Sequence, residues 1–318
     1  MKNENRNKYI DILTAFDLKN IPDLDVAVLG ALELFQKEEL PKLGVDFWGA
    51  FKRPLVVGSG NAEATGRIIF EDQDAIFASE SNYEQKLERI PAIDSVIVIS
   101  ASGGKHAPII AKRAGELGKR VALITNNPHA EAMKFAQSGQ TFVFPKNREP
   151  YTYNTSTYMG MILGKTHEDA RSIQNFISEH IDTLAMPDFS KYDKYFLIVP
   201  TRFSGIIRML QVKFIELFGR RIARDVETSE YMKHAVTVVP SDELFVSFGD
   251  ENKMWGKPEN RLNIPLPENA GYAAMMAIGY YVIAQIQKKH PPYFKENIAG
   301  YADGASKIFG SVISPIVE

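Results

Sequence analysis

The chain has 318 residues, a formal net charge of −2 and a hydrophobic content of 45%. A chain of this length and apolar content forms one large or two medium domains with a substantial core. The near-neutral charge, with no block of like charges, argues against a nucleic-acid or membrane surface as the main partner. The absence of cysteine excludes disulfides, a thiol nucleophile and cysteine metal sites.

The sequence shows no segment that would carry the protein into or across a membrane. Its first residues are polar and lack the apolar core of a signal peptide. The most apolar late segment, residues 272–286, is shorter than the roughly 20 residues that a spanning helix needs. We therefore expect a cytoplasmic protein without a membrane partner.

In the first half of the chain, short apolar runs alternate with segments of helical periodicity. The pattern predicts helices over 24–40, 62–70 and 106–117, and strands over 54–57, 75–78, 95–99, 121–125 and 141–144. Strand–helix alternation at this spacing indicates a parallel sheet covered on both faces.

The second half begins a second αβ pattern after a plausible linker at Met186-Pro187-Asp188. It predicts helices over 155–163, 168–184, 204–218 and 270–288, strands over 195–199, 235–239 and 244–248, and a mixed tail over 291–318 that wraps back onto the body. We predict an α/β fold with an N-terminal domain, residues 1–185, and a C-terminal domain, residues 186–318. Each is a parallel sheet flanked by helices in three layers.

The most informative segment follows the strand at 95–99. The apolar run stops at Ser100-Ala101-Ser102-Gly103-Gly104-Lys105, and a helix follows from His106. Free backbone N–H groups, the positive end of the helix dipole and the hydroxyls of Ser100 and Ser102 would converge there on an anion. A plain strand–helix loop is the alternative, but two hydroxyls and two glycines at a helix start are rarely needed for packing alone. We predict that Ser100, Ser102, Gly103, Gly104 and Lys105 bind a phosphate.

An earlier turn, Gly58-Ser59-Gly60-Asn61, follows the strand at 54–57 and precedes another helix. Ligands of parallel sheets bind outside the carboxyl ends of the strands, and both turns lie at such ends. Ser59, Gly60 and Asn61 are therefore candidates for contacts with sugar hydroxyls. The alternative is that Ser59 or Asn61 only caps the helix.

The two turns resemble the sugar isomerase (SIS) domain family, and the chain is similar to a tandem pair of such domains. Its layout resembles phosphosugar isomerases and deglycases, including the isomerase half of glutamine–fructose-6-phosphate aminotransferase. Three further segments fit this resemblance in order and spacing: 149–157, 213–216 and 230–234. The resemblance implies that Glu216 is the catalytic base and that His234 opens the sugar ring.

The resemblance also implies roles for other residues. Glu149 and Thr155 would line the sugar site, although either could instead belong to the start of the following helix. Lys307 would correspond to a C-terminal lysine that closes over the sugar. The family's ring-opening histidine reaches into the neighbouring subunit's site, so we expect a homodimer or higher homo-oligomer with shared sites.

Each of the two catalytic positions also has a non-catalytic interpretation. Apolar neighbours would raise the pKa of Glu216 if it faces a cleft, which suits a base that moves a proton between C1 and C2. Otherwise Glu216 is a solvent-facing partner of Arg220 or Lys213. His234 could instead be a capping or core histidine. The remaining histidines show no metal spacing, and we expect neither a metal nor a cofactor.

Two features depart from the family pattern. Lys105 stands where the phosphate turn usually has threonine, which adds a charge and removes a compact hydroxyl. The spacing from Glu216 to His234 is also longer than in the aminotransferase pattern. We predict a phosphosugar aldose–ketose isomerase. The alternatives are a fructosamine-phosphate deglycase of the same family and a non-catalytic sugar-phosphate sensor.

Overall fold

The computed structural model describes residues 7–44, 47, 49, 51–234 and 241–318. Backbone contacts divide the chain into two compact units. One, which we call the β1–β5 unit, consists of Glu38–Lys146 and Thr157–His167. The other, the β7–β10 unit, consists of Met1–Lys37, Asn147–Ser156 and Glu168–Glu318. Each unit contains one of the two predicted sheets, which lie on opposite sides of residue 185 in the sequence.

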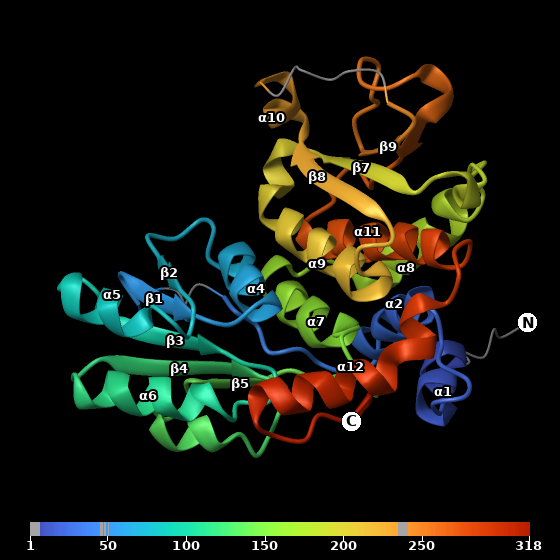
Figure 1. Cartoon of the computed structure of the whole chain (residues 1–318). Helices are drawn as coiled ribbons and strands as arrows, with labels where there is room; N and C mark the ends of the chain where they lie inside the picture. The colour runs from blue at the N-terminus through green and yellow to red at the C-terminus, as the bar shows by residue number, and fades with distance from the viewer. Residues whose placement is uncertain (1–6, 45–46, 48, 50, 235–240) are drawn as a thin grey trace, which may run out of the picture. The chain divides into compact units, whose positions relative to one another are not determined.

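The first sheet has five parallel strands in the order β2-β1-β3-β4-β5 (Figure 1). The strands are β1 (Pro54–Val57), β2 (Ile76–Ala78), β3 (Ser95–Ile99), β4 (Arg120–Thr125) and β5 (Thr141–Val143). The helices that alternate with them are α4 (Asn61–Ile69), α5 (Tyr83–Arg89), α6 (His106–Glu116) and a 3₁₀ turn at Glu131–Phe135, and α7 (Thr155–Thr166) follows β5. All five strands agree with the predicted positions.

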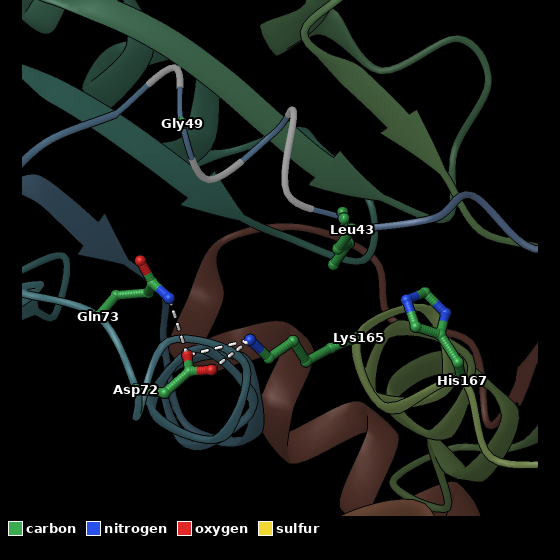
Figure 2. A pocket seen from close by; sticks show the side chains of 7 residues that line it. Leu43, Gly49, Asp72, Gln73, Lys165 and His167 are labelled. Atoms are coloured by element: carbon green, nitrogen blue, oxygen red, sulfur yellow. Dashed lines mark hydrogen bonds and ion pairs between the residues drawn. The ribbon is translucent and has the colours of Figure 1, made fainter.

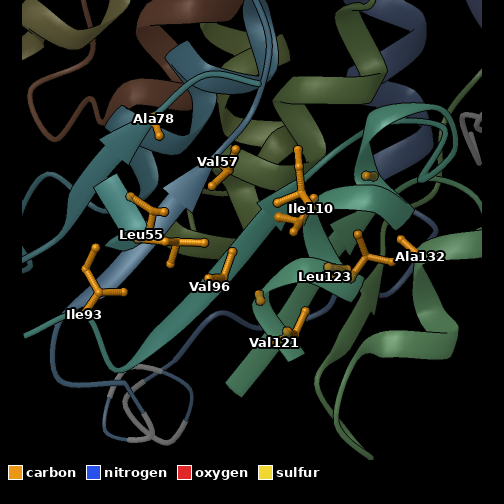
Figure 3. Packing of buried hydrophobic residues seen from close by; sticks show 14 of the residues in the cluster. Leu55, Val57, Ala78, Ile93, Val96, Ile110, Val121, Leu123 and Ala132 are labelled. Atoms are coloured by element: carbon orange, nitrogen blue, oxygen red, sulfur yellow. The ribbon is translucent and has the colours of Figure 1, made fainter. Parts of the chain in front are cut away.

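Side chains that alternate along the strands separate the two faces of this sheet. Leu55 and Val57 of β1 share a buried cluster with Val96 and Val98 of β3 and with Ile110 of α6 (Figure 3). On the opposite face α4 approaches closely, because a Cβ on its Gly66 would lie 2.8 Å from a methyl group of Val56. Helices therefore cover both faces, which confirms the predicted layers.

The second sheet has four parallel strands in the order β10-β9-β7-β8. The strands are β7 (Lys194–Val199), β8 (Ala223–Thr228), β9 (Leu244–Phe248) and β10 (Arg261–Ile264). The helices of this unit are α1 (Lys8–Ala15), α2 (Leu24–Phe35), α8 (Ala170–Phe176) with a π-helical turn at Ile177–Ile181, α9 (Ile207–Phe218), α10 (Ser229–His234), α11 (Tyr272–Gln287) and α12 (Tyr293–Phe309), with 3₁₀ turns at Phe189–Lys191, Thr201–Ile206 and Pro258–Asn260.

The predicted strand at 235–239 lies outside the described residues. α11 is the long, nearly uncharged helix expected from the sequence, and almost all of it is buried. The pattern did not predict β8, β10 or α12. Among the helices of the described part, none is both long and apolar enough to span a membrane.

The tail returns to its own unit. β11 (Ile316–Val317) pairs antiparallel with β6 (Glu149–Pro150), so that Val317 lies opposite Glu149. The tail is thus paired with the segment in which the sequence placed a site residue.

Candidate functional site

The turn after β3 requires glycine at one of its two glycine positions. Gly103 has φ of +60°, and a Cβ there would lie 2.2 Å from the Cβ of Ala130. Gly104 is different, because a Cβ on it would meet only the Ser102 hydroxyl, at 3.8 Å. The turn therefore depends on Gly103 for its shape, whereas Gly104 is sterically replaceable.

The hydroxyls of Ser100 and Ser102 in this turn can each donate a hydrogen bond to a ligand. Ser100 Oγ accepts the Gly103 N–H at 3.1 Å, and Ser102 Oγ accepts the Gly104 N–H at 3.3 Å. A hydroxyl that accepts from the backbone keeps its own O–H for another partner. In the described part of the chain neither O–H has an acceptor, and an anion would supply one.

Side chains at the carboxyl end of β4 donate hydrogen bonds to carbonyl groups of the turn. Thr125 Oγ1 donates to the Ala101 carbonyl at 3.1 Å, and Asn127 Nδ2 donates to the Ser102 carbonyl at 2.9 Å. Engaging these two acceptors leaves donors as the groups that the turn presents to a ligand. Neither Thr125 nor Asn127 was predicted as a site residue, although Thr125 ends β4, the strand next to β3 in the sheet, and Asn127 follows two residues later.

Lys105 is the N-cap residue of α6 and has φ of +52° and ψ of −110°. This backbone conformation is normally reserved for glycine and costs a lysine about 1–3 kcal/mol. Gly60, the N-cap residue of α4, has nearly the same conformation, with φ of +57° and ψ of −120°. The lysine that departs from the family pattern is thus held in a strained position at the amino end of the helix.

The turn after β1 has a different polarity. Ser59 Oγ donates to Glu80 Oε2 at 2.7 Å, so its lone pairs are left to accept. Asn61, only 9% exposed, has an Oδ1 that is buried and accepts no hydrogen bond from the described residues. The N-cap residue of α4 is Gly60, and no side chain bonds to the cap. The alternative in which Ser59 or Asn61 caps this helix is therefore wrong.

Glu80 and His106 were missed by the sequence analysis. Glu80 comes two residues after β2, and its side chain is 36% exposed. His106 begins α6, and its Nε2 lies 3.6 Å from Glu80 Oε2. The strand-end rule that found Ser59 and Ser100 would also have found Glu80, had it been applied to the short strand at 76–78.

A second group of predicted residues lies in the β7–β10 unit around Lys213. The Lys213 ammonium is fully buried and donates to Glu216 Oε2 at 2.8 Å, to the Thr152 carbonyl at 2.6 Å and to the Tyr153 carbonyl at 2.7 Å. The Glu216 side chain is 18% exposed. Burial raises the pKa of Glu216, and the charge and hydrogen bond of Lys213 partly oppose this shift.

This pair differs from the solvent-facing interpretation of Glu216. The carboxylate is paired with Lys213, but it is not on an open surface, because the ammonium beside it is sealed from solvent. From the sequence, Lys213 was expected only as a surface partner of Glu216. The three-residue spacing on one helix predicted the contact between Lys213 and Glu216. The burial of Lys213 was not predictable in this way, because it depends on the carbonyl groups of Thr152 and Tyr153 in a distant segment.

Glu149 and Thr155 meet at the amino end of α7. Glu149 Oε2 accepts the Thr155 N–H and Oε1 accepts the Ser156 N–H, both at 2.7 Å. Burial raises the pKa of Glu149, while these hydrogen bonds and the charge of Lys213 partly oppose the shift. The carboxylate caps the helix, as one of the two sequence alternatives held, and it lies within electrostatic range of Lys213.

His234 and Lys307 are exposed. His234 ends α10, and the described residues show no contact between it and Glu216. Lys307 lies on α12 with a side chain that is 75% exposed and forms an ion pair with Asp303 one turn away. Their predicted roles in ring opening and site closure remain predictions.

A cavity of about 510 Å³ in the β1–β5 unit lies away from these turns (Figure 2). It is lined by Leu43, Gly44, Gly49, Asp72, Gln73, Lys165 and His167. Lys165 reaches across it to Asp72, with Nζ–O distances of 2.8 and 3.0 Å. The residues of the two turns are not among those that line this cavity, whereas ligands of parallel sheets bind at the carboxyl ends of the strands, where the turns lie. We therefore place the candidate anion site at the turns.

Groups of three or more potential metal ligands are absent from the described residues.

No protein-family model and no curated protein matches the sequence. Solved structures do match, at low sequence identity. The C-terminal domain of glucosamine-fructose-6-phosphate aminotransferase from Francisella tularensis is 12% identical, with a TM-score of 0.60 over 92% of this chain and 96% of that chain. The chain has the fold of such enzymes.

Two further examples of solved structures with this fold are also enzymes named for sugar phosphates. Glucosamine-6-phosphate deaminase from Thermotoga maritima is 12% identical, with a TM-score of 0.56 over 88% of this chain and 93% of that one. Tagatose-6-phosphate ketose/aldose isomerase from Escherichia coli is 14% identical, with a TM-score of 0.53 over 91% of each chain. The predicted fold, two parallel sheets in an SIS-like arrangement, is confirmed.

Proposed function

We propose that the protein is a phosphosugar aldose–ketose isomerase with Glu216 as its base. The observation that carries this proposal is the carboxylate of Glu216, mostly buried and paired with the sealed ammonium of Lys213. The donor-lined turn from Ser100 to Lys105 supports it, because such a turn suits a phosphate. The neighbours that share the fold are enzymes named for sugar phosphates, which agrees with the proposal.

The proposed reaction moves one proton between two carbons. In the open-chain aldose, Glu216 takes the proton from C2, a double bond forms between C1 and C2, and the former carbonyl oxygen on C1 takes up a proton from solvent, which gives an enediol. The protonated Glu216 then returns its proton to C1, and the C2 hydroxyl gives its proton to solvent as the C2 carbonyl forms, which gives the ketose. A carboxylate whose pKa is raised by burial is a stronger base than a free glutamate and suits this step.

His234 is proposed to open the ring, by taking the proton of the anomeric hydroxyl and giving one to the ring oxygen. Its exposure on α10 suits a histidine that serves the site of a second copy, and we propose a homodimer or a higher homo-oligomer for this reason. The same exposure favours the second candidate function. A sugar-phosphate sensor needs the anion turn but no positioned acid and base.

Proton exchange tests the enzyme directly. The protein is incubated in D2O with a panel of hexose, amino-sugar and fructosamine 6-phosphates, and NMR follows the C2–H signal of the aldoses and the C1–H signals of the ketoses. We expect deuterium to enter one substrate, and Glu216→Gln to abolish this exchange while inorganic phosphate still binds. Products of the exchanging substrate distinguish isomerisation from deglycation.

The exchange rate also has an expected pH dependence. Glu216 must be ionised to accept a proton, so the rate should rise as the pH passes upward through its pKa, which burial places above the ordinary glutamate value. Glu116→Gln, which alters an exposed ion-paired carboxylate at the far end of α6, is the matched control and should leave the rate unchanged. Phosphate binding without exchange on any sugar phosphate would favour the sensor.

A further inference from the structure

The two turns of the β1–β5 unit present opposite hydrogen-bonding groups. Ser100 and Ser102 accept from the backbone and keep an O–H to donate, which suits an anion. Ser59 gives its O–H to Glu80 and keeps lone pairs, which suits a donor. Because β1 and β3 are neighbours, the two turns leave the sheet about one strand spacing, roughly 5 Å, apart.

Three acceptors belong to the residues that directly follow β1 and β2. Ser59 Oγ has lone pairs, Asn61 Oδ1 is buried without a donor, and Glu80 Oε1 has no partner among the described residues. A buried acceptor without a donor costs free energy until a ligand supplies one. Glu80 also gives this set a negative charge. That charge disfavours a purely anionic ligand and favours a ligand that also carries a positively charged group.

We propose that Ser59, Asn61 and Glu80 form a specificity subsite for the protonated amino group of an amino-sugar phosphate whose phosphate binds at Ser100–Lys105. An ammonium has three donors, no acceptor and one positive charge, and it therefore matches three acceptors of which one is a carboxylate. A neutral hydroxyl has a single donor and leaves two acceptors unsatisfied. The inference rests on the proposed sugar-phosphate function and names the substrate class within it.

Calorimetric titration with three ligands tests the subsite: inorganic phosphate, glucose 6-phosphate and glucosamine 6-phosphate. We expect the unaltered protein to bind the amino sugar at least roughly tenfold more tightly than the neutral sugar, as for a charge-assisted hydrogen bond. Glu80→Gln should abolish this preference while the affinities for phosphate and glucose 6-phosphate stay within about twofold. Ser59→Ala should reduce the preference in the same direction.

Glu116→Gln is again the control, since it removes an exposed carboxylate outside the turns and should keep the full preference. Glu80 is partly exposed, so its amide variant is expected to fold, and thermal unfolding checks this. Equal binding of the two sugars, or a preference that survives Glu80→Gln, would overturn the subsite alone. Failure of phosphate and both sugars to bind would overturn the sugar-phosphate function together with it.

Discussion

The turns after β1 and β3 share a backbone plan but differ in chemistry. Each leads from a buried parallel strand into a helix, and each places a residue of nearly identical positive φ at the N-cap. After β1 that residue is glycine and the nearby serine donates to a carboxylate. After β3 it is lysine and the serines accept from the backbone. One strand–helix geometry therefore presents two opposite kinds of hydrogen-bonding group.

The difference shows what the backbone determines and what the side chains determine. The backbone sets where the proposed ligand would lie, outside the carboxyl ends of adjacent strands. The direction of each hydroxyl depends on its nearest partner, which is a backbone N–H after β3 and Glu80 after β1. Substitutions at the two turns should therefore separate folding from ligand polarity.

The largest expected effect is on folding, at Gly103. Gly103→Ala forces a side chain into positive φ and against Ala130, and we expect a loss of about 3 kcal/mol in the free energy of unfolding. Gly104→Ala is the matched variant and should change it by less than about 0.5 kcal/mol. Urea denaturation measures both. Equal losses for the two alanines would refute the steric distinction between these glycines.

An effect of intermediate size is expected on ligand binding. Ser100→Ala or Ser102→Ala removes an O–H that is free to donate, and we expect the affinity for inorganic phosphate to fall by about five- to tenfold. Ser59→Ala removes a hydroxyl whose proton is already bound to Glu80, so phosphate affinity should change by less than about twofold. If Ser59→Ala weakened phosphate as much as Ser100→Ala, the assigned polarity would be wrong.

The strands and turns of the first sheet were predictable because buried parallel strands are continuous apolar runs and their ends carry glycine and hydroxyl residues. β8 was not, because Arg224, Asp225 and Glu227 interrupt its apolar pattern, as suits a strand at the edge of the sheet. α12 was missed because it follows Pro291 and Pro292 and contains internal glycines, which weaken a helical pattern.

The candidate site was predictable only where a local pattern carries the chemistry. Ser100 to Lys105 form such a pattern, and their proposed role as an anion site rests on geometry within a few residues. The surroundings of Glu216 depend on Lys213, whose burial requires the carbonyl groups of Thr152 and Tyr153, about 60 residues earlier in the chain. Long-range partners of this kind leave no periodic signal in a single sequence.

The smallest expected effect is at the N-cap that distinguishes the turns. Lys105→Gly would give the β3 turn the glycine that the β1 turn has at Gly60, and relief of the strained backbone should raise the free energy of unfolding by about 1 kcal/mol. The same variant removes a positive charge beside the proposed anion turn, so phosphate affinity should fall by about threefold or more.

Gly60→Ala is the converse control and should lower the free energy of unfolding by about 1 kcal/mol, since only backbone conformation opposes a Cβ there. A Lys105→Gly variant that is less stable than the parent would show that the lysine contributes to folding, whereas one that is more stable but binds phosphate weakly would show strain retained for binding.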